Sequence, residues 1–135
     1  MRIVLDTNVL VAGLLNPAGA CGRLLDMVLD GAVLCSADER ILREYEEVLR
    51  RPSLALPARS VREFLTFLRH TAEFVTPLPL HLELPHPDDL PFVEVAAASG
   101  ATLVTGNLRH YPKRGVGRVT VVSPAEALDL LGPSA

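Results

Sequence analysis

Short apolar runs alternate with amphipathic segments along the whole chain. The first run, from Arg2 to Asp6, is almost continuously apolar and ends at a carboxylate, as buried parallel strands do. Similar runs predict strands at 32–35, 73–76, 101–105 and 119–122. The segments between them predict helices at 8–15, 20–30, 36–50, 57–71, 88–100 and 124–131. Strands that alternate with helices form parallel sheets through right-handed crossovers, so we expect a three-layer α/β/α domain with a central parallel sheet.

Two helix starts carry the sequence of a capping box. Ser36 with Glu39, and Ser123 with Glu126, have the spacing at which each side chain bonds the other's backbone N–H. The helix expected after Ser36 carries one apolar stripe, formed by Ile41, Leu42, Tyr45, Val48 and Leu49. Glu44 and Glu46 lie at the two borders of this stripe, and the periodicity does not choose between them.

Composition limits the class of protein. A chain of 135 residues and 14.6 kDa is the size of one domain, so a single domain over 1–135 is expected. A hydrophobic share of 49% against 21% charged residues excludes general disorder. We find no membrane-spanning run or signal-peptide layout, and expect a cytoplasmic protein without a membrane partner. Cys21 and Cys35 form no zinc or disulfide motif.

Charge is distributed unevenly, although the net charge is only −3. Between Arg69 and Arg109 every charged side chain is acidic, whereas between Glu94 and Glu126 every one is basic. An acidic segment followed by a basic one suits a cation site beside a surface that binds a polyanion. An uneven solvated surface is the alternative that charge alone leaves open.

Polar residues follow two of the expected strands. Asp6, Thr7 and Asn8 come after the first, and Asn107 comes after the strand at 101–105. Ligands of parallel sheets bind beyond the carboxyl ends of the strands. The expected crossovers could bring Glu44 and the Asp88-Asp89 pair to the same edge. Carboxylate and amide oxygens without paired His or Cys favour Mg²⁺ or Mn²⁺, which indicates phosphoryl-transfer or phosphodiester chemistry.

Four ordered segments give the chain a family resemblance. They are residues 3–10 (IVLDTNVL), 42–52 (LREYEEVLRRP), 87–96 (PDDLPFVEVA) and 103–107 (LVTGN). Together they resemble the PIN-domain family, in particular the VapC-like toxin components of bacterial type II toxin-antitoxin systems. The resemblance implies a metal-dependent endoribonuclease that cuts single-stranded RNA at a cluster of acidic residues, leaving 5′-phosphate and 3′-hydroxyl ends. It also implies a cognate antitoxin and a homodimer as assembly partners.

Matching the family's motifs to this sequence indicates which residues would form the site. The resemblance places the catalytic acids at Asp6, Glu44 and Asp89, with Asp88 as a further metal ligand, and so prefers Glu44 to Glu46. It gives Thr7 and Asn8 a supporting role, in which their side chains would orient the metal ligands without binding the metal themselves. The fourth position departs from the pattern, because many relatives carry Asp where this chain has Asn107. An amide can coordinate through oxygen but brings no charge.

The basic residues that follow the fourth segment are the candidate RNA contacts. Arg109, Lys113 and Arg114 would position phosphates without reading sequence. His110 lies among them as a surface or capping residue that could meet substrate, and no role is assigned to His70, His81 or His86.

Two other readings stay open. The first is a PIN-like module that binds nucleic acid or protein with weak or no catalysis, because of Asn107. The second is a receiver-type phosphoacceptor, which needs a lysine at a late strand end, whereas Lys113 follows Tyr111-Pro112 in an expected loop. Nucleotide hydrolysis is poorly supported, because the sequence has no glycine-rich phosphate-binding motif.

Overall fold

The computed structural model describes residues 1–132 of the chain. Its strands are β1 (Arg2–Leu5), β2 (Leu34–Ala37), β3 (Glu73–Phe74), β4 (Thr102–Val104) and β5 (Val121–Val122). Its α-helices are α1 (Thr7–Leu15), α2 (Ala20–Leu29), α3 (Glu39–Leu49), α4 (Ala58–Thr71), α5 (Leu90–Ser99) and α6 (Pro124–Leu131). Short 3₁₀ turns at Pro52–Leu54, Pro87–Asp89, Leu108–His110 and Lys113–Gly115 complete it.

All five strands belong to one parallel sheet in the order β3-β2-β1-β4-β5. The central strand β1 pairs with β2 on one side and with β4 on the other, with Leu5 beside Val104. Because the strands are parallel, their carboxyl ends share one edge. Asp6 extends this edge, where its backbone N–H donates to the carbonyl of Val104 at 2.9 Å.

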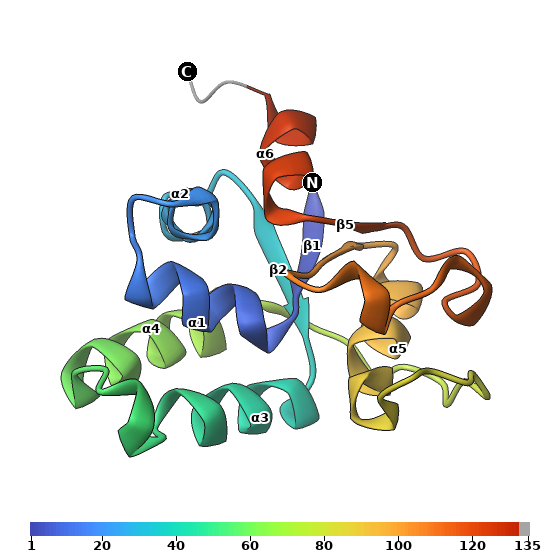
Figure 1. Cartoon of the computed structure of the whole chain (residues 1–135), viewed down its shortest axis with the longest axis horizontal. Helices are drawn as coiled ribbons and strands as arrows, with labels where there is room; N and C mark the ends of the chain where they lie inside the picture. The colour runs from blue at the N-terminus through green and yellow to red at the C-terminus, as the bar shows by residue number, and fades with distance from the viewer. Residues whose placement is uncertain (133–135) are drawn as a thin grey trace.

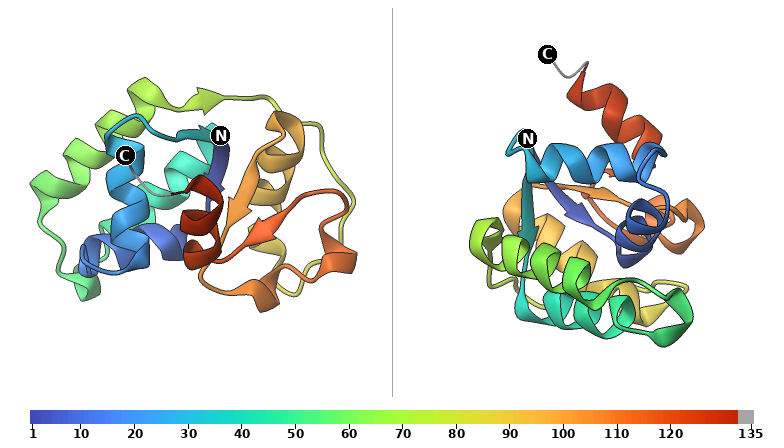
Figure 2. Two further views of the ribbon diagram at one scale, coloured as in Figure 1. Left: turned by 90° about the horizontal axis from the view of Figure 1, so that it is seen from above. Right: turned by 90° about the vertical axis from the view of Figure 1, so that its left-hand side faces the viewer.

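Helices cover both faces of the sheet (Figure 1). The views in Figure 2 show α1, α2 and α6 on one side and α4 and α5, with α3 alongside, on the other. This is the expected three-layer α/β/α fold. The strand residues Ile3, Val4 and Leu103 are completely buried between the layers, and Phe92 of α5 packs against the same core. The apolar stripe of α3 is buried as expected, except that Val48 is only partly covered.

The prediction of a capping box at Ser36 is wrong. Ser36 is a buried residue of β2, and the N-cap of α3 is Asp38, whose Oδ1 accepts from the N–H of Ile41 at 3.0 Å. The backbone N–H of Ala32 bonds back to Met27 at the end of α2, so β2 begins later than the apolar pattern predicts. The box at Ser123 and Glu126 is present in both directions.

Other boundaries differ by a few residues. The last strand starts at Val121 rather than Val119, because the N–H of Val119 bonds the carbonyl of Val116 in a turn. Within residues 1–132, no helix is both long and apolar enough to cross a membrane. The prediction of one domain over 1–135 includes residues 133–135, which lie outside the described part of the chain.

Candidate metal and RNA site

Asp6 lies at the centre of the carboxyl edge of the sheet, and its side chain is held by residues from the first turn of α1 and from the loop between β4 and β5. Its Oδ2 accepts hydrogen bonds from Thr105 Oγ1 at 2.8 Å, from Tyr111 OH at 2.9 Å and from Asn8 Nδ2 at 3.4 Å. Asp6 and its two hydroxyl donors, Thr105 and Tyr111, are all buried. Within residues 1–132, no hydrogen bond reaches Oδ1, so one oxygen is fixed by the protein and the other is free to bind a ligand.

Glu44 approaches this edge from α3. The buried hydroxyl of Thr7, next to Asp6 in the chain, donates to Oε2 of Glu44, and Oε1 has no protein partner among the described residues. Glu46 is exposed and pairs with Arg50 at 3.4 Å along the same helix. The structure therefore turns Glu44, and not Glu46, toward Asp6.

Asp89 lies at the N-terminus of α5. Its Oδ2 is 3.0 Å from Nδ1 of His110, while Oδ1 has no hydrogen-bond partner in the described chain. The His110 ring packs against that of His86, with ring centroids 4.0 Å apart and the ring planes tilted by 32°. The neighbouring Asp88 is exposed. Asp89, like Asp6 and Glu44, thus has one oxygen held by a protein donor and one left free.

The three carboxylates act on one another electrostatically. Burial, followed by the negative charges of Asp6, Asp89 and Asp88, raises the pKa of Glu44, against a lowering by the Thr7 hydrogen bond. Burial and the charge of Asp6 likewise raise the pKa of Asp89, while His110 lowers it. The pKa of Tyr111 is also raised by burial and by the charge of the Asp6 carboxylate that it bonds. Asp6, Glu44 and Asp89 therefore form one cluster of interacting negative charge.

The donor set fits a hard divalent cation. Each carboxylate offers a free oxygen, and a cation would offset repulsion that burial strengthens. As the side chains are placed, no group of three acidic, histidine or cysteine residues within 1–132 is tight enough to hold an ion. The cluster thus has the chemistry and charge of a magnesium or manganese site without a closed ligand cage.

The remaining predicted residues are distributed around this cluster. The Asn8 side chain accepts from the N–H of Gly106 at 2.9 Å and so ties the first turn of α1 to the loop after β4. Asn107 is partly buried, and its side chain makes no hydrogen bond within the described chain. Arg109, Lys113 and Arg114 are exposed and take part in none of the ion pairs among residues 1–132.

Sequence reasoning missed several supporting residues. Thr105 follows β4 directly, and its place at a strand end was a usable signal. Tyr111 has no such signal, because its partner Asp6 is far away in the chain. His86 and His110 meet at Asp89 only because the segments before α5 and after β4 come together. His110 is therefore neither a free surface residue nor a helix cap.

Comparisons with known proteins agree with this architecture. A protein of Methanocaldococcus jannaschii, the uncharacterized protein MJ1680, is 26% identical over 110 residues, which cover 79% of this chain and 71% of that protein. The solved structure of VapBC2 from Rickettsia felis, bound to a DNA fragment from its promoter, contains a chain of similar fold. The TM-score is 0.59 at 18% sequence identity, over 91% of this chain and 98% of that one.

A family model decides the classification. The PIN domain model matches residues 2–109, a range that includes β1, α3, α5 and β4 and also the carboxylates of Asp6, Glu44 and Asp89. The chain belongs to the PIN-domain family.

Proposed function

We propose that this protein is an endoribonuclease that depends on Mg²⁺ or Mn²⁺, cleaves single-stranded RNA and acts as the toxin of a toxin-antitoxin pair. The observation that carries the proposal is the cluster of Asp6, Glu44 and Asp89. These residues come from three separate segments, and each carboxylate keeps one oxygen free. Burial and the neighbouring negative charges raise the pKa values of Glu44 and Asp89. Such clusters of like charge at a strand edge are typical of functional sites.

Asp6, Glu44 and Asp89 would hold the ion, with Asp88 and Asn107 beside them. A bound Mg²⁺ or Mn²⁺ supplies Lewis-acid chemistry, since it polarises a phosphate and lowers the pKa of a coordinated water. The surrounding residues orient the ligands. Thr105 and Tyr111 fix the plane of the Asp6 carboxylate, and Thr7 fixes that of Glu44.

The exposed basic side chains support binding of a polyanion. Arg109, Lys113 and Arg114 have no acidic partner within the described chain, so their charges are available to RNA phosphates. They lie on the loop that also contributes His110 and Tyr111 to the acidic cluster. Phosphate contacts of this kind position a strand without selecting its sequence.

The assembly partners belong to the same proposal. The family resemblance indicates a VapC-like toxin, and the similar solved chain comes from a VapBC2 structure. We therefore propose a cognate antitoxin and a homodimer for this chain. Co-purification with the product of a neighbouring small gene, followed by light scattering, measures both.

Cleavage of an unstructured RNA by the purified protein, with Mn²⁺, Mg²⁺ or EDTA, tests the activity. We expect cleavage with either metal, none in EDTA, and a loss of at least about 100-fold in Asp6→Asn. Glu44→Gln should abolish cleavage, whereas Glu46→Gln, on the exposed border of the same helix, should retain it. Equal activity of both glutamine variants would contradict the proposed site.

Asn107 favours one alternative, a PIN-like binding module without catalysis. Its side chain brings no charge to the cluster, and the ligand cage is not closed. RNA binding that is independent of metal, without cleavage by the wild-type protein, would support this second candidate.

A further inference from the structure

A buried acid lies on α5 outside the candidate metal site. Glu94 is only 4% exposed, and both of its oxygens are used. Oε1 accepts from Nη1 of Arg40 at 2.7 Å, and Oε2 accepts from the backbone N–H of Leu80 at 2.7 Å. A buried carboxylate without a paired cation is strongly destabilising. The packing of this part of α5 therefore depends on Arg40.

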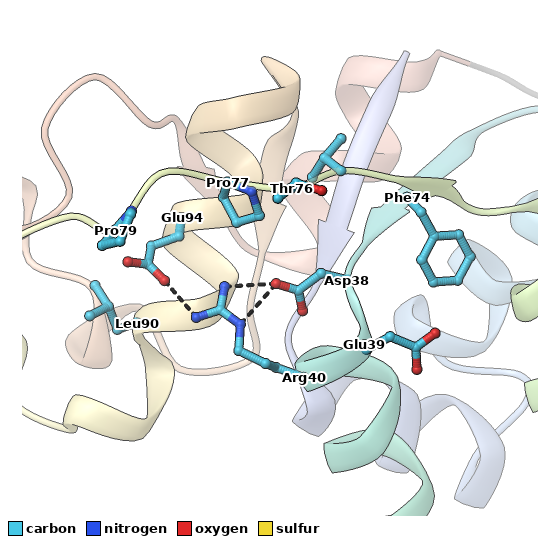
Figure 3. A pocket seen from close by; sticks show the side chains of 10 residues that line it. Asp38, Glu39, Arg40, Phe74, Thr76, Pro77, Pro79, Leu90 and Glu94 are labelled. Carbon is cyan, nitrogen blue, oxygen red and sulfur yellow. Dashed lines mark hydrogen bonds and ion pairs between the residues drawn. The ribbon is translucent and has the colours of Figure 1, made fainter.

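Arg40 joins Glu94 to the start of α3. Its Nε and Nη2 donate to Oδ2 of Asp38 at 2.9 and 2.7 Å, while Oδ1 of Asp38 caps α3. Figure 3 shows the guanidinium between the two carboxylates. All three side chains line a hollow of about 650 Å³. The planar fork of Arg40 satisfies both acids at once, which a lysine ammonium could not do in this geometry. Arg40 thus connects α3 to α5, and Glu94 in turn connects α5 to the segment that precedes it, through the N–H of Leu80.

The same two elements also carry like charges. Glu44 lies one turn after Arg40 on α3, which places both side chains on neighbouring positions of one helix face. Asp89 immediately precedes α5, and its negative charge acts on Glu44. The pair Arg40 and Glu94 therefore attracts α3 toward α5, while Glu44 and Asp89 repel each other between the same two elements.

We propose that the ion pair of Arg40 and Glu94 is a positioning element that holds α3 and the start of α5 at the spacing where Glu44 and Asp89 can share one divalent ion. The identity of that ion rests on the proposed function, but the spacing role does not. Arg40 and Glu94 touch no reacting atom in this scheme. They act through the backbone positions of the two helices.

The test removes the pair without changing the net charge. The Arg40→Gln/Glu94→Gln double variant is compared with Arg59→Gln/Glu63→Gln, which removes an exposed pair of the same residue types on α4. Calorimetry measures Mn²⁺ binding. Amide hydrogen exchange in EDTA measures local opening at residues 94–96 of α5, relative to the central strand β1. We expect Mn²⁺ binding at least fivefold weaker and exchange at 94–96 at least tenfold faster than in the wild type, with neither change in the control.

The outcomes separate a positioning role from simple stabilisation. A Kd for Mn²⁺ within twofold of the wild-type value, or protection lost evenly across the chain, would overturn the proposal even if Tm falls. Arg40→Lys retains the positive charge but lacks the planar guanidinium that bonds both carboxylates. If the double variant does not fold, Mn²⁺ binding and hydrogen exchange at residues 94–96 are measured on Arg40→Lys instead. A wild-type protein that binds no Mn²⁺ would contradict the proposed function, and hydrogen exchange alone would then decide the spacing role.

Discussion

The hydroxyl of Tyr111 donates a 2.9 Å hydrogen bond to Oδ2 of Asp6 across a sequence separation of 105 residues. The tyrosine is 3% exposed, and Thr105 donates to the same oxygen. A buried carboxylate that accepts two hydroxyls on one oxygen is fixed in orientation. The loop after β4 therefore determines where the other oxygen of Asp6 points.

Tyr111→Phe should destabilise the protein by about 1.5–3 kcal/mol, the usual contribution of a hydrogen bond to a charged group. The ring still fills its space, so the effect reports the hydroxyl alone. Urea unfolding in EDTA measures it, and Thr71→Val, which removes an exposed hydroxyl bonded to the carbonyl of Phe67, is the control. A loss below about 0.5 kcal/mol would mean that water replaces this donor.

Glu44→Gln should stabilise the metal-free protein at neutral pH by on the order of 1 kcal/mol, because it removes a like charge from the cluster. Folding raises the pKa of Glu44, so the folded protein takes up this proton more readily than the unfolded chain. The ionised Glu44 repels the neighbouring carboxylates fully above its folded-state pKa. This repulsion disappears as the pH falls through the folded-state pKa toward the ordinary pKa of glutamate. Unfolding curves at several pH values should show the stability gap closing in acid. A gap that does not change with pH would exclude charge as the cause.

Divalent ions should raise Tm, because an ion that binds only the folded state stabilises it by about 2.7 kcal/mol at 100 times its Kd. Thermal unfolding with Mn²⁺ and with EDTA measures this shift. Asp89→Asn should abolish most of it. The exposed Asp129→Asn on α6 should leave it unchanged, and an equal shift in both variants would place the ion elsewhere.

Asn107→Asp should tighten Mn²⁺ binding by about tenfold, since a fourth charge at about 1.4 kcal/mol is one order of magnitude in Kd. The same charge should lower stability in EDTA by adding repulsion. Calorimetry and unfolding measure the two effects. An unchanged Kd would remove residue 107 from the site.

The triple variant in question replaces Arg109, Lys113 and Arg114 by glutamine. We expect it to bind RNA at least about tenfold more weakly at low salt. Its affinity should also depend less steeply on salt concentration, because fewer counterions are released when RNA binds. Fluorescence anisotropy of a labelled RNA at several salt concentrations measures both. Arg50→Gln/Arg51→Gln/Arg59→Gln on the α3 and α4 hairpin is the matched control, because those arginines have acidic partners. A normal salt slope in the triple variant would place the RNA on another surface.

Local patterns along the sequence determined the architecture. The apolar runs that became β1 and β4, the caps at Ser123 and Gly100 and the alternation of strands with helices are all short-range features. Their physical basis is burial of apolar side chains at a period of 2 or 3.6 residues, together with backbone hydrogen bonds at helix ends. The strand ends at Asp6 and Thr105 could therefore be located from the sequence alone.

Tertiary packing decided which polar groups meet at those ends. The helical period makes Glu44 and Glu46 equivalent, and only the resemblance preferred Glu44. In the fold, α1 brings Thr7 against one border of α3 and leaves the other in solvent. The bonds of Tyr111 to Asp6, His110 to Asp89 and Arg40 to Glu94 join distant segments. Such contacts depend on where the crossovers place each helix, and local periodicity carries no information about that placement.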